Sequence, residues 1–185
     1  STSSSSGGPT ATFLQTDTTT EGTWIGTYGS DGSAIATVNP QTIPSYVSSL
    51  SFVSPATWTW AASTTDNRAT ETGFGTARTA ATWYTTSFYI DLNFSDTNTH
   101  QVAVYAVDWD GEGRSETVQI TNASTGAQLD IRTLSNFGNG AYLVWNISGH
   151  VRINISKVTG NNAVVSGVFL RRKSLGPKLK PIRHA

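Results

Sequence analysis

The sequence is dominated by short stretches in which apolar and polar side chains alternate with a period of two. In "SFYIDLNF" (residues 87–94) and "VRINIS" (151–156), every second residue is large and apolar. Successive side chains of a β-strand point to opposite faces, so this pattern predicts strands with one buried face. Apolar residues at helical spacing do not recur over any long stretch, and the chain is therefore expected to be all-β.

Other stretches are apolar on both faces, as a central strand would be. "QVAVYAV" (101–107) and "AVVSGVFL" (163–170) are of this kind, and turn sequences such as "DGEGR" and "VTGNNA" separate the runs. Short strands about 8–12 residues apart predict an antiparallel β-sandwich, and we expect a jelly-roll type. The first third of the chain is less regular, and one helical turn is expected around residues 43–50.

The two ends of the chain differ in composition from the middle. Residues 1–11 are rich in Ser and Gly, which is typical of a flexible linker, and residues 171–185 form a basic tail that contains Gly and Pro and is expected to be disordered. The β-sandwich domain is therefore expected to span residues 12–170. A linker before a single domain suggests a monomeric module of a longer, multidomain protein.

Charge and composition exclude several classes of function. Charged residues make up 13% of the chain, about half the usual quarter, and the surface is expected to be neutral and rich in hydroxyl groups. Such a composition is typical of exported proteins that act on polysaccharides. Residues 1–170 hold twelve acidic and six basic side chains, which disfavours nucleic-acid binding. The sequence contains no stretch of 18 apolar residues for membrane insertion and no cysteine for a disulfide scaffold.

The chain offers few candidates for catalysis. His100 and His150 are not in the sequence context of a catalytic triad or a zinc motif, and we expect them to be turn or surface residues. Asp108 and Asp110, with Glu112 nearby, are the best carboxylate pair for glycoside hydrolysis. Glycosidases usually take their two acids from opposite walls of a cleft, whereas these acids belong to one loop. We therefore predict no catalytic residue.

The same loop has a second interpretation as a cation site. Asp108, Asp110 and Glu112 in "DWDGEG" supply oxygen ligands of the kind that calcium prefers, and the stretch resembles the beginning of a calcium-binding loop. A structural Ca²⁺ is thus one expectation. The alternative is that Arg114 pairs with Asp108 or Asp110 and holds the turn without a metal ion.

The stretch "TWTW" is the main candidate for ligand binding. If residues 57–60 form a strand, Trp58 and Trp60 point the same way, either into the core or into solvent as a platform for a sugar ring. Asp66, Asn67 and Arg68 follow closely and supply hydrogen-bonding groups for hydroxyls. Trp145, with apolar residues on its face, is expected in the core. Further aromatic candidates for the carbohydrate surface are Trp24, Tyr28, Trp83, Tyr84 and Trp109.

Four stretches resemble a widespread bacterial β-sandwich domain: "DTTTEGTWIGTYGSDG", "YAVDWDGEGR", "YLVWNISGHVRINIS" and "NNAVVSGVFL". The resemblance covers about Phe13 to Leu170. Such domains occur as accessory modules of large secreted or cell-surface proteins, often beside glycoside hydrolases or immunoglobulin-like repeats. The resemblance implies fold and context, and it carries over no ligand residues.

The sequence as a whole predicts a non-catalytic, carbohydrate-binding module of an exported bacterial protein, located outside the cell or on its surface. Its expected partner is a polysaccharide or glycan. Two alternatives stay open: a jelly-roll glycoside hydrolase or polysaccharide lyase that uses Asp108, Asp110 or Glu112, and a structural or adhesive surface domain.

Overall fold

The computed structural model describes residues 7–173, which form strands, turns and loops without a helix. The strands are β1 (Thr10–Asp17), β2 (Gly32–Ile35), β3 (Val47–Val53), β4 (Ala56–Ala61), β5 (Thr70–Glu71), β6 (Arg78–Thr85), β7 (Ser87–Phe94), β8 (His100–Ala106), β9 (Ser115–Asn122), β10 (Gln128–Ser135), β11 (Ala141–Ser148), β12 (His150–Thr159), β13 (Ala163–Val165) and β14 (Gly167–Arg172).

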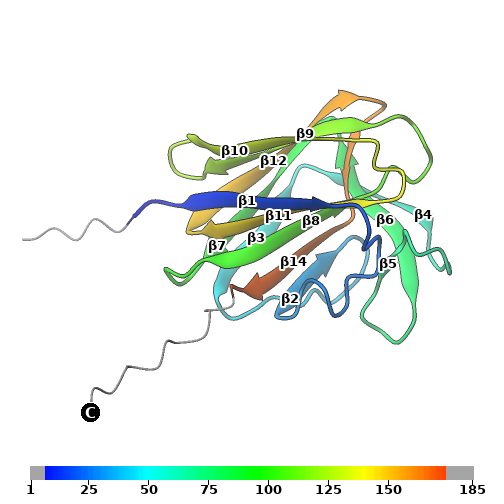
Figure 1. Ribbon diagram of the computed structural model, residues 1–185, viewed down its shortest axis with the longest axis horizontal. Helices are drawn as coiled ribbons and strands as arrows, with labels where there is room; N and C mark the ends of the chain where they lie inside the picture. The colour runs from blue at the N-terminus through cyan, green and yellow to red at the C-terminus, as the bar shows by residue number, and fades with distance from the viewer. Residues whose placement is uncertain (1–6, 174–185) are drawn as a thin grey trace, which may run out of the picture.

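The strands form two five-stranded antiparallel sheets and one smaller sheet. The first sheet has the order β1-β11-β8-β14-β2, and the second has the order β10-β9-β12-β7-β3. The small sheet, β13-β6-β4 with β5 paired to β6, lies at one end of the molecule (Figure 1). The prediction of an all-β antiparallel sandwich is confirmed, while the jelly-roll connectivity stays a prediction.

The main core lies between the inner faces of the two large sheets. The alternating apolar residues of β7 and β12 are buried there, as their period of two predicts, and so is the fully buried Trp145 of β11. A second apolar cluster covers the opposite face of the first sheet, where Tyr105 and Tyr142 pack against Trp24 and Tyr28 from the segment between β1 and β2. Strands β8 and β11 are therefore buried on both faces.

Two local expectations from the sequence are wrong. Residues 43–50 contain a turn and the start of β3 instead of a helical turn. His100 is 1% exposed, donates a hydrogen bond from Nε2 to the carboxylate of Asp96, and stacks on Tyr46 at 3.9 Å between ring centroids. The stacking partner comes from a distant loop, so the local sequence carries no signal for this burial. His150, by contrast, keeps 40% of its side chain exposed.

The ordered strands extend slightly beyond the predicted domain limits. β1 begins at Thr10 and β14 ends at Arg172, so the strands extend two residues beyond each predicted limit of the domain, residues 12 and 170. Most of the predicted linker and tail, residues 1–6 and 174–185, lies outside the described residues. Both ends of the described chain lie away from β4 and β6 (Figure 1).

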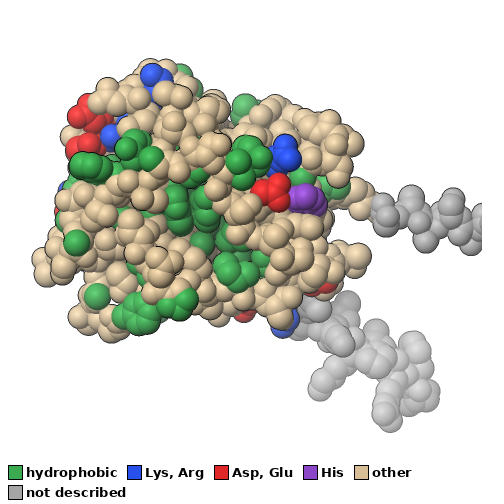
Figure 2. Space-filling model, turned by 180° about the vertical axis from the view of Figure 1, so that it is seen from behind, with side chains coloured by type: hydrophobic (Ala, Val, Ile, Leu, Met, Phe, Trp, Pro, Cys, Tyr) green, Lys and Arg blue, Asp and Glu red, His purple; other side chains and the backbone are tan. Residues whose placement is uncertain are grey.

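The surface has the uncharged character that the composition predicts. Seen from behind, most of it is backbone or uncharged polar side chain, with a few separate charged groups (Figure 2). The described residues include no helix that is long and apolar enough to cross a membrane.

Candidate functional site

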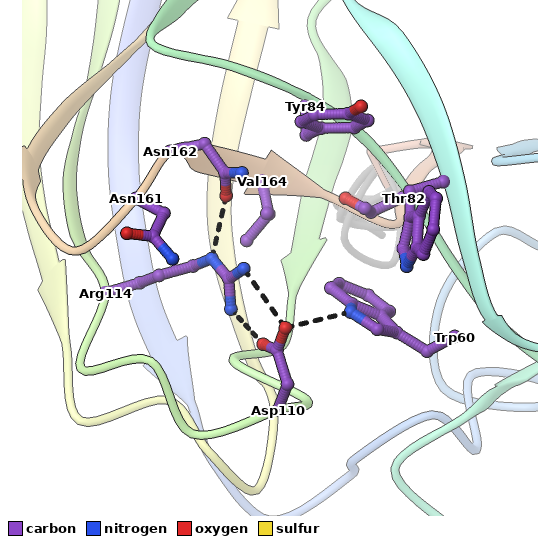
Figure 3. Close-up of a pocket in the computed structure, with 9 residues that line it drawn as sticks. Trp60, Thr82, Tyr84, Asp110, Arg114, Asn161, Asn162 and Val164 are labelled. Atoms are coloured by element: carbon purple, nitrogen blue, oxygen red, sulfur yellow. Dashed lines mark hydrogen bonds and ion pairs between the residues drawn. The ribbon is translucent and has the colours of Figure 1, made fainter.

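The small sheet and two loops enclose a pocket of about 250 Å³ at the end of the sandwich. One loop connects β8 to β9, and the other is the turn between β12 and β13. The pocket is lined by Trp58, Trp60, Thr82, Tyr84 and Val164 from the sheet and by Asp110, Arg114, Asn161 and Asn162 from the loops. Figure 3 shows the rings of Tyr84 and Trp60 on one side of this space, with Arg114 and the two asparagines on the other.

Strand pairing explains why these sheet residues share one face. Trp58 of β4 lies opposite Thr82 of β6, and Val164 of β13 lies opposite Tyr84. Cross-strand partners and residues two apart on a strand project from the same face of a sheet. The floor of the pocket is therefore built by side chains from all three strands.

Trp58 and Trp60 both line the pocket, as their spacing predicts, but they differ in exposure. Trp58 is 56% exposed, whereas Trp60 is half-buried and packs against both apolar clusters. The pairing of β4 with β6 shifts register between Thr59 and Ala61, so Trp60 sits in a β-bulge. Its indole N–H donates to Asp110 Oδ2 at 3.3 Å, which fixes the ring at the edge of the pocket.

Arg114 connects the two loops that form the polar wall. Its guanidinium donates to both oxygens of Asp110 and to Asn162 Oδ1 at 2.8 Å (Figure 3). It also donates to Asp108 at 2.6 Å. The same group lies 5.8 Å from the centre of the Trp60 ring. Arg114 is 5% exposed, so these contacts give it a fixed position in the wall.

Asp108 organises the backbone of the loop that carries Arg114. Its carboxylate accepts hydrogen bonds from the backbone N–H groups of Glu112, Gly113 and Arg114. Gly111 and Gly113 both have a φ of 68°, a conformation that glycine adopts without strain. These two glycines let the chain fold around a single buried carboxylate.

These contacts do not fit the predicted calcium site. Asp108 and Asp110 are both paired with Arg114, and Glu112 Oε2 accepts a hydrogen bond from Asn161 at 2.8 Å instead of converging with them. In residues 7–173, no group of three acidic or histidine side chains is placed to hold a metal ion. The geometry is that of the alternative interpretation, in which Arg114 holds the turn.

Arg114 also sets the charge state of the pocket wall. Burial raises the pKa of Asp110, but the hydrogen bonds and the positive charge of Arg114 outweigh burial, and the net pKa is lowered. Asp110 is therefore ionised at neutral pH and lacks the proton that a general acid needs.

A third tryptophan, Trp109, extends the surface beyond the pocket. Trp109 stacks beside Trp60 at 6.5 Å between ring centroids, and the guanidinium of Arg68 lies 4.4 Å from the centre of the Trp109 ring. Asp66 pairs with Arg68 at 2.8 Å. The predicted residues Asp66 and Arg68 thus lie next to Trp109, outside the lining of the pocket. Asn67 is exposed, and its backbone carbonyl accepts a hydrogen bond from Gly22.

Three aromatic candidates are buried and do not belong to this surface. Trp24 and Tyr28 are 8% and 4% exposed and belong to the second apolar cluster, on the face of the first sheet opposite the main core. Trp24 donates its indole N–H to the backbone carbonyl of Glu71. Trp83 is 8% exposed and stacks on Phe52 at 3.7 Å. Trp83 and Tyr84 are adjacent on β6 and point to opposite faces, so only Tyr84 reaches the pocket.

Several pocket residues carry no signal in the sequence. Asn161 and Asn162 belong to "VTGNNA", which predicts only a turn, and Thr82 and Val164 are ordinary strand residues. The two asparagines reach the pocket because the turn between β12 and β13 meets the β8–β9 loop, about 50 residues away in the chain, through the Glu112–Asn161 hydrogen bond.

A buried acid lies directly behind the pocket. Glu116 of β9 is fully buried, and its Oε2 accepts a hydrogen bond from the backbone N–H of Val164 at 2.8 Å. Its Oε1 has no hydrogen-bond partner among the described residues. Burial raises the pKa of Glu116 to about 8, so the carboxyl is mostly protonated at neutral pH.

Comparisons with known proteins assign no family to this chain. No protein-family model matches the sequence. No curated protein matches it either. The function is therefore inferred from the pocket and its side chains.

Proposed function

We propose that the protein is a non-catalytic, carbohydrate-binding module of an exported bacterial multidomain protein. The observation that carries the proposal is the pair Trp58 and Trp60, which line one polar pocket while Trp58 keeps 56% of its surface exposed. Two indoles that meet in one pocket rimmed by polar side chains differ from a single exposed aromatic ring, because such a concentration of apolar surface is typical of a binding site.

The chemistry of the pocket matches a sugar ring. A pyranose presents C–H groups on its faces, which stack on the electron-rich face of an indole, and hydroxyl groups around its rim. Asn161 and Asn162 supply amide groups at the opposite side of the pocket from Trp60, and Tyr84 supplies a hydroxyl group on the side of the Trp60 ring. A volume of about 250 Å³ lies just below the range typical of drug-sized ligands and suits one sugar unit of a longer chain.

The position of the pocket suits a module within a longer chain. The described ends of the chain lie at the far end of the sandwich from β4 and β6 (Figure 1). A domain attached at either end would leave the pocket open. Binding to polysaccharide would then raise the concentration of the attached domain at its substrate.

The environments of Asp108 and Asp110 favour a binding function over the alternative of a glycoside hydrolase. Asp108 is buried and bonded to three backbone N–H groups and to Arg114, and the lowered pKa of Asp110 keeps it ionised. Both carboxylates therefore have structural partners, whereas a glycosidase needs one protonated acid and one free carboxylate. A purely structural spacer would have no use for an exposed indole in a pocket.

The proposal is tested by binding to a set of soluble polysaccharides and oligosaccharides with Trp58→Ala and a matched control. Phe74 is 61% exposed and does not line the pocket, so Phe74→Ala removes an exposed aromatic ring elsewhere. We expect Trp58→Ala to weaken binding by about 1–3 kcal/mol, by analogy with base–aromatic stacking, and Phe74→Ala to bind like the wild type.

Three results would contradict the proposal. The first is an absence of binding to every glycan tested. The second is an equal loss of binding in Trp58→Ala and Phe74→Ala, which would indicate an unspecific effect. The third is release of reducing sugar or unsaturated product from any polysaccharide, which would establish an enzyme.

A further inference from the structure

The cation of the pocket wall, Arg114, is held by four hydrogen bonds to internal partners. The guanidinium of Arg114 engages all three of its nitrogens: Nη1 with Asp108 and Asp110, Nη2 with Asp110, and Nε with Asn162. Recognition of a ligand carboxylate or sulfate by arginine depends on a free pair of parallel N–H groups. Arg114 has no such pair to offer.

The N–H groups of the second arginine of this surface, Arg68, are also bonded to partners within the protein. Arg68 donates from Nε and Nη2 to Asp66 and from Nη1 to the Gly138 carbonyl at 3.1 Å. The face of its guanidinium covers Trp109. Its charge is therefore balanced by Asp66, and its donors point away from a ligand.

The remaining charged groups around the pocket are acidic. Among the described residues, the charged side chains that line the pocket or bond to its lining are Arg114 and four acids, Asp108, Asp110, Glu112 and Glu116. Asp108 and Asp110 together exceed the charge of Arg114, and exposed Glu112 adds to this excess. The pocket therefore repels an anion, even while Glu116 is protonated.

The groups that stay available to a ligand are uncharged or accept hydrogen bonds. Within residues 7–173, no hydrogen bond occupies the Tyr84 hydroxyl, the Asn161 carbonyl oxygen or the Asn162 amino group. Figure 3 shows these three side chains around the same space. Hydroxyl groups donate and accept, so a neutral sugar can use all three.

From this distribution of charge we infer that the pocket selects neutral sugar units and discriminates against uronic acids and sulfated sugars. The inference rests on the proposed carbohydrate binding and adds the class of ligand to it. Glu112 and Asp110 are the side chains that set this specificity. Asp110 lines the pocket, Glu112 is bonded to the lining residue Asn161, and Arg114 alone does not balance these charges and that of Asp108.

The test compares matched pairs of oligosaccharides that differ only in oxidation at C6: oligomers of glucose and glucuronic acid, mannose and mannuronic acid, and galactose and galacturonic acid. Affinities are measured by calorimetry at pH 7 in about 50 mM salt. For the backbone that binds, we expect the neutral member to bind about tenfold more tightly, the effect of a like-charge contact near a protein surface. In about 0.5 M salt the difference should shrink, because salt screens exposed charges.

Two variants test whether the acids cause the difference. Glu112→Gln keeps a hydrogen-bond acceptor for Asn161 and removes one exposed charge, and Asp110→Asn removes the charge beside Trp60. Each should raise the affinity for the uronic acid member, relative to the neutral member, by about threefold. Glu112 does not line the pocket, so Glu112→Gln should also leave the affinity for the neutral member unchanged. Because Glu112 is exposed, its variant is expected to fold even if Asp110→Asn does not.

The possible results separate this inference from the proposed function. If a uronic acid oligomer binds as tightly as its neutral partner, or more tightly, the specificity is wrong and carbohydrate binding stands. A neutral preference that neither salt nor Glu112→Gln alters would also overturn it, because the discrimination would then be steric. If no member of any pair binds, the proposed function fails, and the inference fails with it.

Discussion

The guanidinium of Arg114 lies 2.6 Å from a carboxylate oxygen of Asp108, and the two side chains are only 4% and 8% exposed. This ion pair joins the beginning and end of the loop between β8 and β9. Removal of Arg114 leaves the buried Asp108 carboxylate without its cation, and removal of Asp108 leaves Arg114 with Asp110 as its remaining carboxylate partner. Breaking such a buried pair costs more than the pair itself contributes. The loop and the pocket wall therefore depend on both residues together.

We expect Asp108→Ala to lower the free energy of unfolding by about 3–5 kcal/mol, because Arg114 and three backbone N–H groups lose their acceptor. The control is Asp66→Ala, whose partner Arg68 is 28% exposed and whose loss should cost about 1 kcal/mol or less. Denaturant unfolding measures both. Equal costs for the two variants would contradict a special role of the buried pair.

Removal of divalent cations should leave the stability of the protein unchanged. Arg114 takes the place that a calcium ion would need between Asp108 and Asp110. The measurement is thermal unfolding with a chelator and with millimolar calcium. A rise in melting temperature with calcium concentration would show preferential binding to the folded state and would restore the calcium interpretation.

The tryptophans should differ in their effect on stability according to their burial. Trp83→Ala should cost about 3–5 kcal/mol, because it removes the ring that stacks on Phe52 in the core. Trp58→Ala should stay within about 0.5 kcal/mol of the wild type, since the side chain is mostly exposed. Trp60→Ala should fall between these values. A large cost for Trp58→Ala in denaturant unfolding would identify it as a structural residue.

Glu116 should make the protein less stable as the pH rises from about 4.5 to about 8. Its pKa is raised from 4.5 to about 8 by burial, so across this range the unfolded chain releases the proton while the folded chain keeps it. Glu116→Gln, which cannot ionise, should remove this slope, and its advantage over the wild type should grow to several kcal/mol near pH 8. Parallel stability curves for the two proteins from pH 5 to pH 8 would contradict the raised pKa.

At acid pH the opposite dependence is expected. A hydrogen bond from Arg68 lowers the pKa of Asp66; burial raises the pKa of Asp110 and Asp130, but hydrogen bonds from Arg114 and Arg132 lower it more. Carboxylates with lowered pKa stabilise the fold above their ordinary pKa of about 3.9, and this contribution is lost as the pH falls further. Unfolding curves below pH 4 should therefore show a decline in both the wild type and Glu116→Gln.

Much of the fold follows from local alternation in the sequence. Ile90 and Ile153 are buried because each is one of several apolar residues on one face of a strand, and a shift by one residue would expose them all. The burial of His100 could not be predicted in this way, because its stacking partner Tyr46 lies in a loop distant in the chain. The burial of Trp24 in the second apolar cluster could not be predicted either, because it depends on how the irregular segment between β1 and β2 folds over the first sheet.

The candidate site was only partly predictable. The spacing of Trp58 and Trp60 predicts a shared environment, and both do line the pocket. The sequence cannot decide which of two adjacent aromatics, Trp83 or Tyr84, faces the core, because that depends on where the small sheet packs. Asn162 lines the pocket because the turn between β12 and β13 contacts the β8–β9 loop. A contact between two segments distant in the chain cannot be predicted from a local sequence pattern.

The β-bulge at Trp60 has a consequence for how the chain behaves in a crowded solution. Among the described residues, β4 pairs only with β6, so its outer edge presents free backbone groups beside an exposed indole. A flat strand of this kind would recruit the edges of other molecules and seed aggregates. The bulge twists β4 and breaks its regular spacing, so that the strand can display Trp58 to a ligand while remaining a poor template for another strand.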